Sequence, residues 1–93
     1  MEITVKLGEP LNRIAGQSLI SLELPEGTTV TQALDRLSRA YPSVAAALVD
    51  DSSRPTLGFQ YFVNRKWLRD DDLARHQLKA RDRLYILAPI VGG

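Results

Sequence analysis

One segment of the 93-residue sequence, from Thr29 to Tyr41, has the periodicity of an amphipathic helix. Thr29 and Gln32 have the T-x-x-Q spacing of a capping box, which predicts the helix start. Pro42 disfavours the α conformation in the residue before it, which predicts the end. A single stripe recurs at helical spacing and predicts buried positions, Leu34 and Leu37 among them: Val30, Ala33, Leu34, Leu37 and Tyr41. One long helix cannot form a bundle, so its stripe needs a sheet to pack against.

The rest of the sequence supplies strands for that sheet. Residues 2–7 and 20–24 alternate apolar and polar side chains and are separated by a loop, which predicts an N-terminal hairpin. Residues 59–64 and 83–88 are rich in aromatic and branched residues, and 66–68 favour a short edge strand. Residues 43–49 indicate a short helix or turn, and 70–79 an irregular segment or helical turn. We therefore predict an α+β domain over residues 1–88, with one main helix packed across a mixed four- to five-stranded sheet.

Composition excludes several classes of function. Hydrophobic residues make up 44% and charged residues 25%, an ordinary globular balance. There is no apolar run long enough to span a membrane, and the N-terminus lacks the basic start and apolar core of a signal peptide. Cysteine is absent, which is compatible with a cytoplasmic location. The net charge of +1 is too small to suggest a nucleic-acid partner.

No side chain in this plan has an obvious catalytic or metal-binding partner. His76 is the only histidine, so a site with several histidine ligands is impossible. Asp70, Asp71 and Asp72 lack the spacing of a cation-binding loop, and a solvated run is the favoured interpretation. We interpret Trp67 as an anchor that packs the edge segment onto the domain, in preference to a stacking platform for a ligand. No bound metal or cofactor is expected.

The C-terminus is the part of the sequence that most suggests chemistry. The last strand continues directly into Pro89, Ile90 and Val91 and then Gly92-Gly93. Two glycines make the thinnest tail a chain can have, able to enter a narrow slot on another protein. At average glycine usage, a terminal pair arises by chance in about one chain in 200. This pattern favours a reactive C-terminal carboxylate on a flexible tail formed by residues 89–93.

With this order of elements, the sequence resembles the small ubiquitin-like sulfur carriers, namely the small subunit of molybdopterin synthase and the thiamine sulfur carrier. The motifs that carry the resemblance span nearly the whole chain: Pro25-Glu26-Gly27-Thr28-Thr29-Val30, Ala33-Leu34, Leu37, Tyr41-Pro42, Val63-Asn64, Asp82-Arg83-Leu84-Tyr85-Ile86 and Pro89-Ile90-Val91-Gly92-Gly93. Pro89 before the tail looks more like the molybdopterin branch. One departure is Arg81, where relatives often have glycine, and it predicts an altered turn before the last strand.

The resemblance implies a β-grasp fold and a carrier function. In such carriers a ubiquitin-activating-type adenylyltransferase uses ATP to adenylate the terminal glycine, here Gly93. Sulfur then replaces AMP, and the resulting thiocarboxylate donates sulfur on a second partner, such as the large subunit of a molybdopterin synthase-like enzyme. The chain is then a non-catalytic carrier or the small subunit of a sulfurtransferase complex. Sulfur carriage for thiamine or cysteine synthesis and conjugation to lysines as a ubiquitin-like modifier remain alternatives.

Partner recognition is expected on the face of the sheet that the helix leaves open. Leu84 and Ile86 alternate with Tyr85 and Leu87 in the last strand, and the alternation alone does not say which pair faces outward. We predict that Leu87, with Phe59 or Tyr61, faces the partner, because Leu87 lies nearest the tail.

Overall fold

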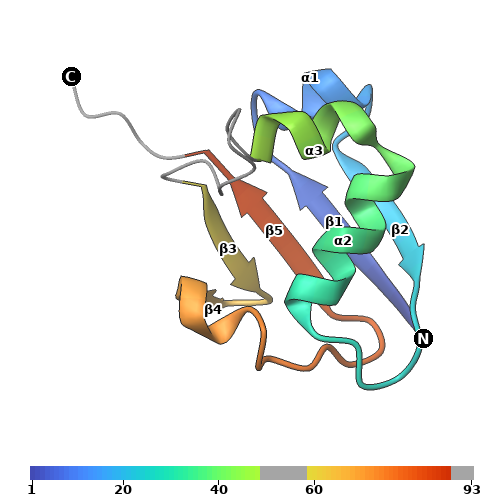
Figure 1. Ribbon diagram of the computed structural model, residues 1–93, viewed down its shortest axis with the longest axis vertical. Helices are drawn as coiled ribbons and strands as arrows, with labels where there is room; N and C mark the ends of the chain where they lie inside the picture. Colours follow the sequence, from blue (N-terminus) through green and yellow to red (C-terminus); the bar gives the residue numbers. More distant parts are fainter. Residues whose placement is uncertain (49–58, 89–93) are drawn as a thin grey trace.

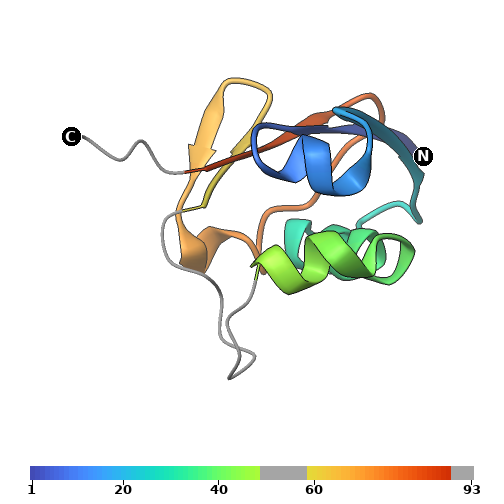
Figure 2. The same ribbon diagram turned by 90° about the horizontal axis from the view of Figure 1, so that it is seen from above.

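A computed structural model describes residues 1–48 and 59–88. The elements follow in the order β1 (Glu2–Leu7), α1 (Leu11–Ala15), β2 (Leu19–Glu23), α2 (Val30–Ala40), α3 (Pro42–Leu48), β3 (Gln60–Val63), β4 (Lys66–Leu68), the 3-10 turn η1 (Asp70–Asp72) and β5 (Arg83–Leu87). The five strands form one sheet, and helices α2 and α3 lie in a layer on one face of this sheet (Figures 1 and 2). The predicted α+β architecture is confirmed. In the described part of the chain, no helix has the length and apolar character needed to span a bilayer.

The strands lie in the order β2-β1-β5-β3-β4. β1 and β2 form the predicted antiparallel hairpin, β5 runs parallel to β1, and β3 pairs antiparallel with β5 and with β4. The first and last strands in the sequence, β1 and β5, are therefore neighbours in the middle of the sheet, and β2 and β4 form the two edges of the sheet.

Helix α2 begins as the sequence predicts. The Thr29 hydroxyl oxygen accepts a hydrogen bond from the Gln32 backbone N–H at 3.3 Å, and the Gln32 side-chain oxygen accepts one from the Thr29 N–H at 2.9 Å. The next two free N–H groups of the helix donate to distant carbonyls, Val30 to His76 and Thr31 to Leu73. The N-terminus of α2 is thus fully satisfied and joined to the segment before β5.

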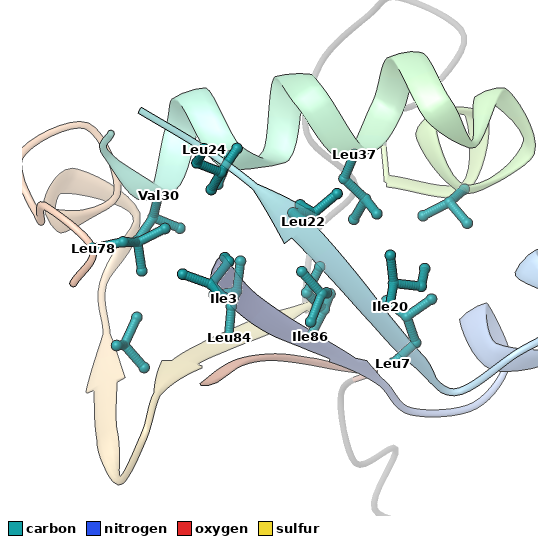
Figure 3. Packing of buried hydrophobic residues seen from close by; sticks show 14 of the residues in the cluster. Ile3, Leu7, Ile20, Leu22, Leu24, Val30, Leu37, Leu78, Leu84 and Ile86 are labelled. Atoms are coloured by element: carbon teal, nitrogen blue, oxygen red, sulfur yellow. The ribbon is translucent and has the colours of Figure 1, made fainter. Parts of the chain in front are cut away.

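The core lies between α2 and the inner face of the sheet. Leu37 is fully buried and points from α2 toward Ile20 and Leu22 (Figure 3). Leu84 and Ile86 of β5 are fully buried as well, which settles the alternation of the last strand. Leu34 packs against the core but is only partly buried, so the prediction that it is buried against the sheet is confirmed only in part. α2 is rotated so that Val30, Ala33 and Leu37 face the sheet directly.

Two local features differ from expectation, at residues 11–15 and at Arg81, and the short helix expected over residues 43–49 is present as α3. Residues 11–15, predicted as loop, form α1 and bury Leu11 completely. This helix is too short for periodicity to reveal it. Pro42 ends α2 and also begins α3, because its missing N–H is tolerated in the first helical position. Arg81 adopts φ of 70°, the conformation glycine favours, so the altered turn predicted for this position is not observed.

Candidate functional site

The outer face of the sheet is the surface that the α2–α3 layer leaves open (Figure 2). The pairing registers place one residue of each strand in a single row across it, in the order of the strands. From edge to edge this row consists of Leu19, Lys6, Tyr85, Phe62 and Trp67. We call these five residues the outer row. Three adjacent strands, β5, β3 and β4, each contribute an aromatic side chain to it.

The outer row carries two of the three large apolar side chains that are most exposed among the described residues, Leu19 at 55% and Trp67 at 53%. A half-exposed tryptophan cannot serve mainly as a packing anchor, so the interpretation of Trp67 as such an anchor is wrong. Its exposure follows from β4, where Leu68 takes the inward position and is 2% exposed. Aromatic side chains at this exposure are typical of protein interaction surfaces.

Leu87 lies on the outer face, one register step beyond the outer row toward the end of β5. Its side chain covers the backbone of Gly8, where an added Cβ would lie 3.0 Å from Leu87 Cδ2. Gly8 N–H in turn donates to the Ile86 carbonyl at 3.0 Å. The predicted outward orientation of Leu87 is confirmed, and its contact with a partner stays a prediction.

Tyr61 and Phe59 do not share that face. Tyr61 pairs with Leu68 and Ile86, two core residues, and both aromatic side chains pack against the core. Burial raises the pKa of the Tyr61 hydroxyl above its ordinary value of 10, and the nearby negative charge of Asp70 raises it further. The outward orientation predicted for Phe59 and Tyr61 is therefore wrong, and Phe62, one residue along, takes the outer position.

Two segments that carried the family resemblance hold β5 in place. Asn64, with φ of 56° in the β3–β4 turn, donates from its side-chain amide to the Asp82 carboxylate at 3.0 Å and accepts from the Arg83 N–H at 3.0 Å. The other Asp82 oxygen accepts from the Lys79 N–H at 2.8 Å. Asparagine tolerates this left-handed conformation better than most residues. These side chains align the start of β5, whose far end leads toward the C-terminus.

The predicted tail lies outside the described residues: Pro89, Ile90, Val91, Gly92 and Gly93. Val49, the last residue of the short helix or turn predicted over residues 43–49, also lies outside them. What the structure describes is their attachment point. β5 is the central strand, its inward residues Leu84 and Ile86 are fully buried, and its last residue is Leu87. In the two described ranges, no three His, Asp or Glu side chains gather as metal ligands.

Comparisons with known proteins agree with this geometry. Residues 5–93 match the model of the ThiS family. Among curated proteins there is no significant match. The small archaeal modifier protein SAMP1 from Haloferax volcanii is similar in structure, with a TM-score of 0.86 and 24% identity over all of both chains.

Two further similar solved structures are of proteins whose names differ from that of the archaeal modifier. A putative molybdopterin converting factor subunit 1 from Pyrococcus furiosus has a TM-score of 0.76 and 19% identity, over 97% of this chain and 99% of its own. CysO from Amycolatopsis orientalis, solved in a complex with BexX, has a TM-score of 0.73 and 25% identity, over 98% of this chain and 99% of the other. The match of nearly the whole sequence, together with the five-stranded sheet and its one long helix, shows that this chain belongs to the ThiS family of ubiquitin-like β-grasp sulfur carriers.

Proposed function

We propose that this protein carries sulfur as a thiocarboxylate on Gly93 and acts as the small partner of a molybdopterin synthase-like enzyme. The observation that carries the proposal is the family match through residue 93, which includes both terminal glycines. The sequence contains no cysteine, so no thiol of this chain can hold the sulfur. In the proposal, the group that carries the sulfur is therefore the carboxylate of Gly93, as the family resemblance implies.

A carboxylate needs activation before sulfur can be attached. In the proposed reaction an oxygen of the Gly93 carboxylate attacks the α-phosphorus of ATP on a separate adenylyltransferase, and pyrophosphate leaves. A sulfur nucleophile then attacks the carbonyl carbon of this anhydride, and AMP leaves with the electron pair of the broken C–O bond. Covalent activation splits one difficult acyl substitution into two easier steps. The carrier contributes the acyl group and its presentation, and the ATP is bound by its partner.

The outer face supplies the recognition surface in this proposal. Tyr85, Phe62 and Leu87 lie on the two strands nearest the attachment point of the tail, and a partner that covers them is positioned to receive residues 89–93. The solved complex of CysO with BexX gives general support for a partner protein. The same surface serves the activating enzyme and the sulfur acceptor in turn.

Intact mass spectrometry of protein purified from its own host tests the chemistry. Replacement of one carboxylate oxygen by sulfur adds about 16 Da. The matched control is a variant lacking Gly93, which should show no such form and no ATP–pyrophosphate exchange with the cognate adenylyltransferase. Exchange that is unchanged in this variant would remove the proposal.

Conjugation to lysine side chains is the second candidate, favoured by the similarity to SAMP1, a modifier by name. The two functions share the adenylated tail and differ in the product. The modifier function would be favoured if mass spectrometry found this chain in isopeptide-linked conjugates and did not find the thiocarboxylate form.

A further inference from the structure

The free edge of β2 is a second feature of this fold that is suited to binding, apart from the tail. Met1 and Leu24 exchange both backbone hydrogen bonds at 2.8 Å, and the Leu7 N–H donates to the Ser18 carbonyl at 2.8 Å. In an antiparallel pair such bonded positions alternate, so Ile20 and Leu22 also bond to β1. The N–H and C=O groups of Leu19, Ser21 and Glu23 therefore point away from the sheet along its edge.

This edge is poorly protected against pairing. Natural edge strands are usually short, or carry charged side chains and proline along their length. The opposite edge strand, β4, has three residues and begins with Lys66. β2 has five residues, and its one charged residue, Glu23, is at its end and lies 3.6 Å from the N-terminal amine. Three consecutive outward positions are thus available as a template for an added strand.

A hollow of about 430 Å³ lies at the end of this edge. One wall is the connection that follows β2, including Leu24 and Glu26, and the other is the flank of α2, including Arg36 and Arg39. Leu24 continues the register of β2, so a strand that pairs with β2 extends toward the hollow and directs alternate side chains at α2.

The charges of the hollow favour acidic side chains along α2. Arg39 pairs with Asp35 at 3.1 Å, whereas Arg36 takes part in no ion pair within residues 1–48 and 59–88. Glu26 likewise takes part in no ion pair within these ranges, but it belongs to the connection that precedes α2, whereas Arg36 belongs to the helix itself. A carboxylate of the incoming strand that lies along α2 could therefore form an ion pair with the Arg36 guanidinium.

We propose that the β2 edge and this hollow bind an extended, acidic peptide segment of a partner protein by strand addition. Backbone hydrogen bonds to Leu19, Ser21 and Glu23 hold the segment, and Arg36 selects an acidic side chain. Leu24 lies beside Met1 at the start of β1, whereas Leu87 lies past the β1 end, since Leu7 pairs with Ile86. The hollow and the attachment point of the tail are thus at opposite ends of the sheet, and β1 separates the β2 edge from β5, so this segment and the partner that receives the tail can bind together.

A second copy of the chain suits this edge less well. In a two-fold pairing of β2 with β2, both α2 helices lie on the same face of the continuous sheet. The flanks that carry Arg36 and Arg39 would then face each other, and like charges at that interface oppose the pairing. An acidic segment meets the same arginines with the opposite sign.

The test uses the full chain and a capped octapeptide probe of three valine–threonine repeats followed by two aspartates. Amide NMR should show shifts and slowed hydrogen exchange at Leu19, Ser21 and Glu23. Arg36→Glu should weaken probe binding about tenfold, and a probe with lysines in place of the aspartates should bind wild type about as poorly. Ser21→Pro removes an outward N–H at an edge position that tolerates proline, and should abolish binding while the domain stays folded.

Several results would overturn the proposal. One is no response at the three edge amides, and another is equal binding of the acidic and basic probes. Edge shifts that depend on protein concentration without probe would assign the edge to a second copy instead. Arg36→Glu and Ser21→Pro leave the tail untouched, so adenylation of Gly93 in both variants reports the proposed carrier function separately.

Discussion

Leu37 offers the sharpest test of how α2 sits on the sheet. Its side chain is fully buried and points at Ile20 and Leu22 (Figure 3). Truncation of a buried leucine to alanine loses the transfer free energy of the removed atoms and leaves a cavity, and costs about 2.7–5 kcal/mol. Since Leu37 is fully enclosed, we expect Leu37→Ala to cost about 3–4 kcal/mol.

Leu34→Ala is the matched comparison on the same helix. The chemical change is identical and helix propensity changes equally, but Leu34 is only partly buried at the flank of the stripe. Solvent and neighbouring side chains can fill the space it leaves, so we expect a cost of about 1–2 kcal/mol. The difference between the two variants therefore isolates burial from every other effect of the substitution.

Urea unfolding followed by circular dichroism measures both costs. A domain of this length has about 5–14 kcal/mol of total stability, so Leu37→Ala removes a large share of it. The melting temperature should fall by roughly 12–32 °C for Leu37→Ala and by roughly 4–16 °C for Leu34→Ala. Equal destabilisation by the two substitutions, with unchanged denaturant dependence, would refute the orientation of α2 described here.

Four further substitutions test the tail, the outer face, an ionisable core residue and a strained turn. Gly92→Val should slow ATP–pyrophosphate exchange about tenfold or more without a change in melting temperature, because a β-branched side chain obstructs a slot that fits glycine; normal exchange would contradict it. Leu87→Asp should weaken binding to the activating enzyme in a pull-down while circular dichroism stays native, and global unfolding would show that this side chain is needed for the core. The folded-state pKa of Tyr61 is raised, so its contribution to stability is complete below its unfolded pKa near 10 and declines as pH rises beyond it; Tyr61→Phe should reduce the loss of stability above that pH in alkaline urea titrations, and an unchanged slope would argue against burial of the hydroxyl. Arg81→Gly should raise stability by up to about 1 kcal/mol, since relief of a left-handed conformation exceeds the added entropy of the unfolded chain, whereas destabilisation would mean that the Arg81 side chain makes a stabilising contact.

Local patterns in the sequence were sufficient for the elements that have strong periodicity or chemical punctuation. The capping box at Thr29 and Gln32, the hairpin of β1 and β2, and the end of α2 at Pro42 were all predicted and are all present. Each depends on interactions between residues close in sequence, or on a single backbone constraint. α1 escaped prediction because five residues are too few to show a period, and its burial of Leu11 depends on distant parts of the chain.

The two faces of the last strand could be decided only by tertiary structure. All four residues from Leu84 to Leu87 are apolar or aromatic, so the period-two alternation does not indicate which pair of side chains faces the core. The register with β1 and β3 turns Leu84 and Ile86 toward α2 and leaves Tyr85 and Leu87 outside.

The same reason explains the errors at Tyr61 and Trp67. Each is aromatic, and aromatic character fits a core and an interface equally well. Pairing with Leu68 and Ile86 places Tyr61 inside, and the inward position of Leu68 leaves Trp67 exposed. The family could be recognised from short motifs spread along the chain, because each motif is a local pattern, and the same motifs predict the chemistry proposed for the terminal glycine. Only the folded sheet decided which side chains form the outer row and which edge remains open, because these depend on register between strands far apart in the chain.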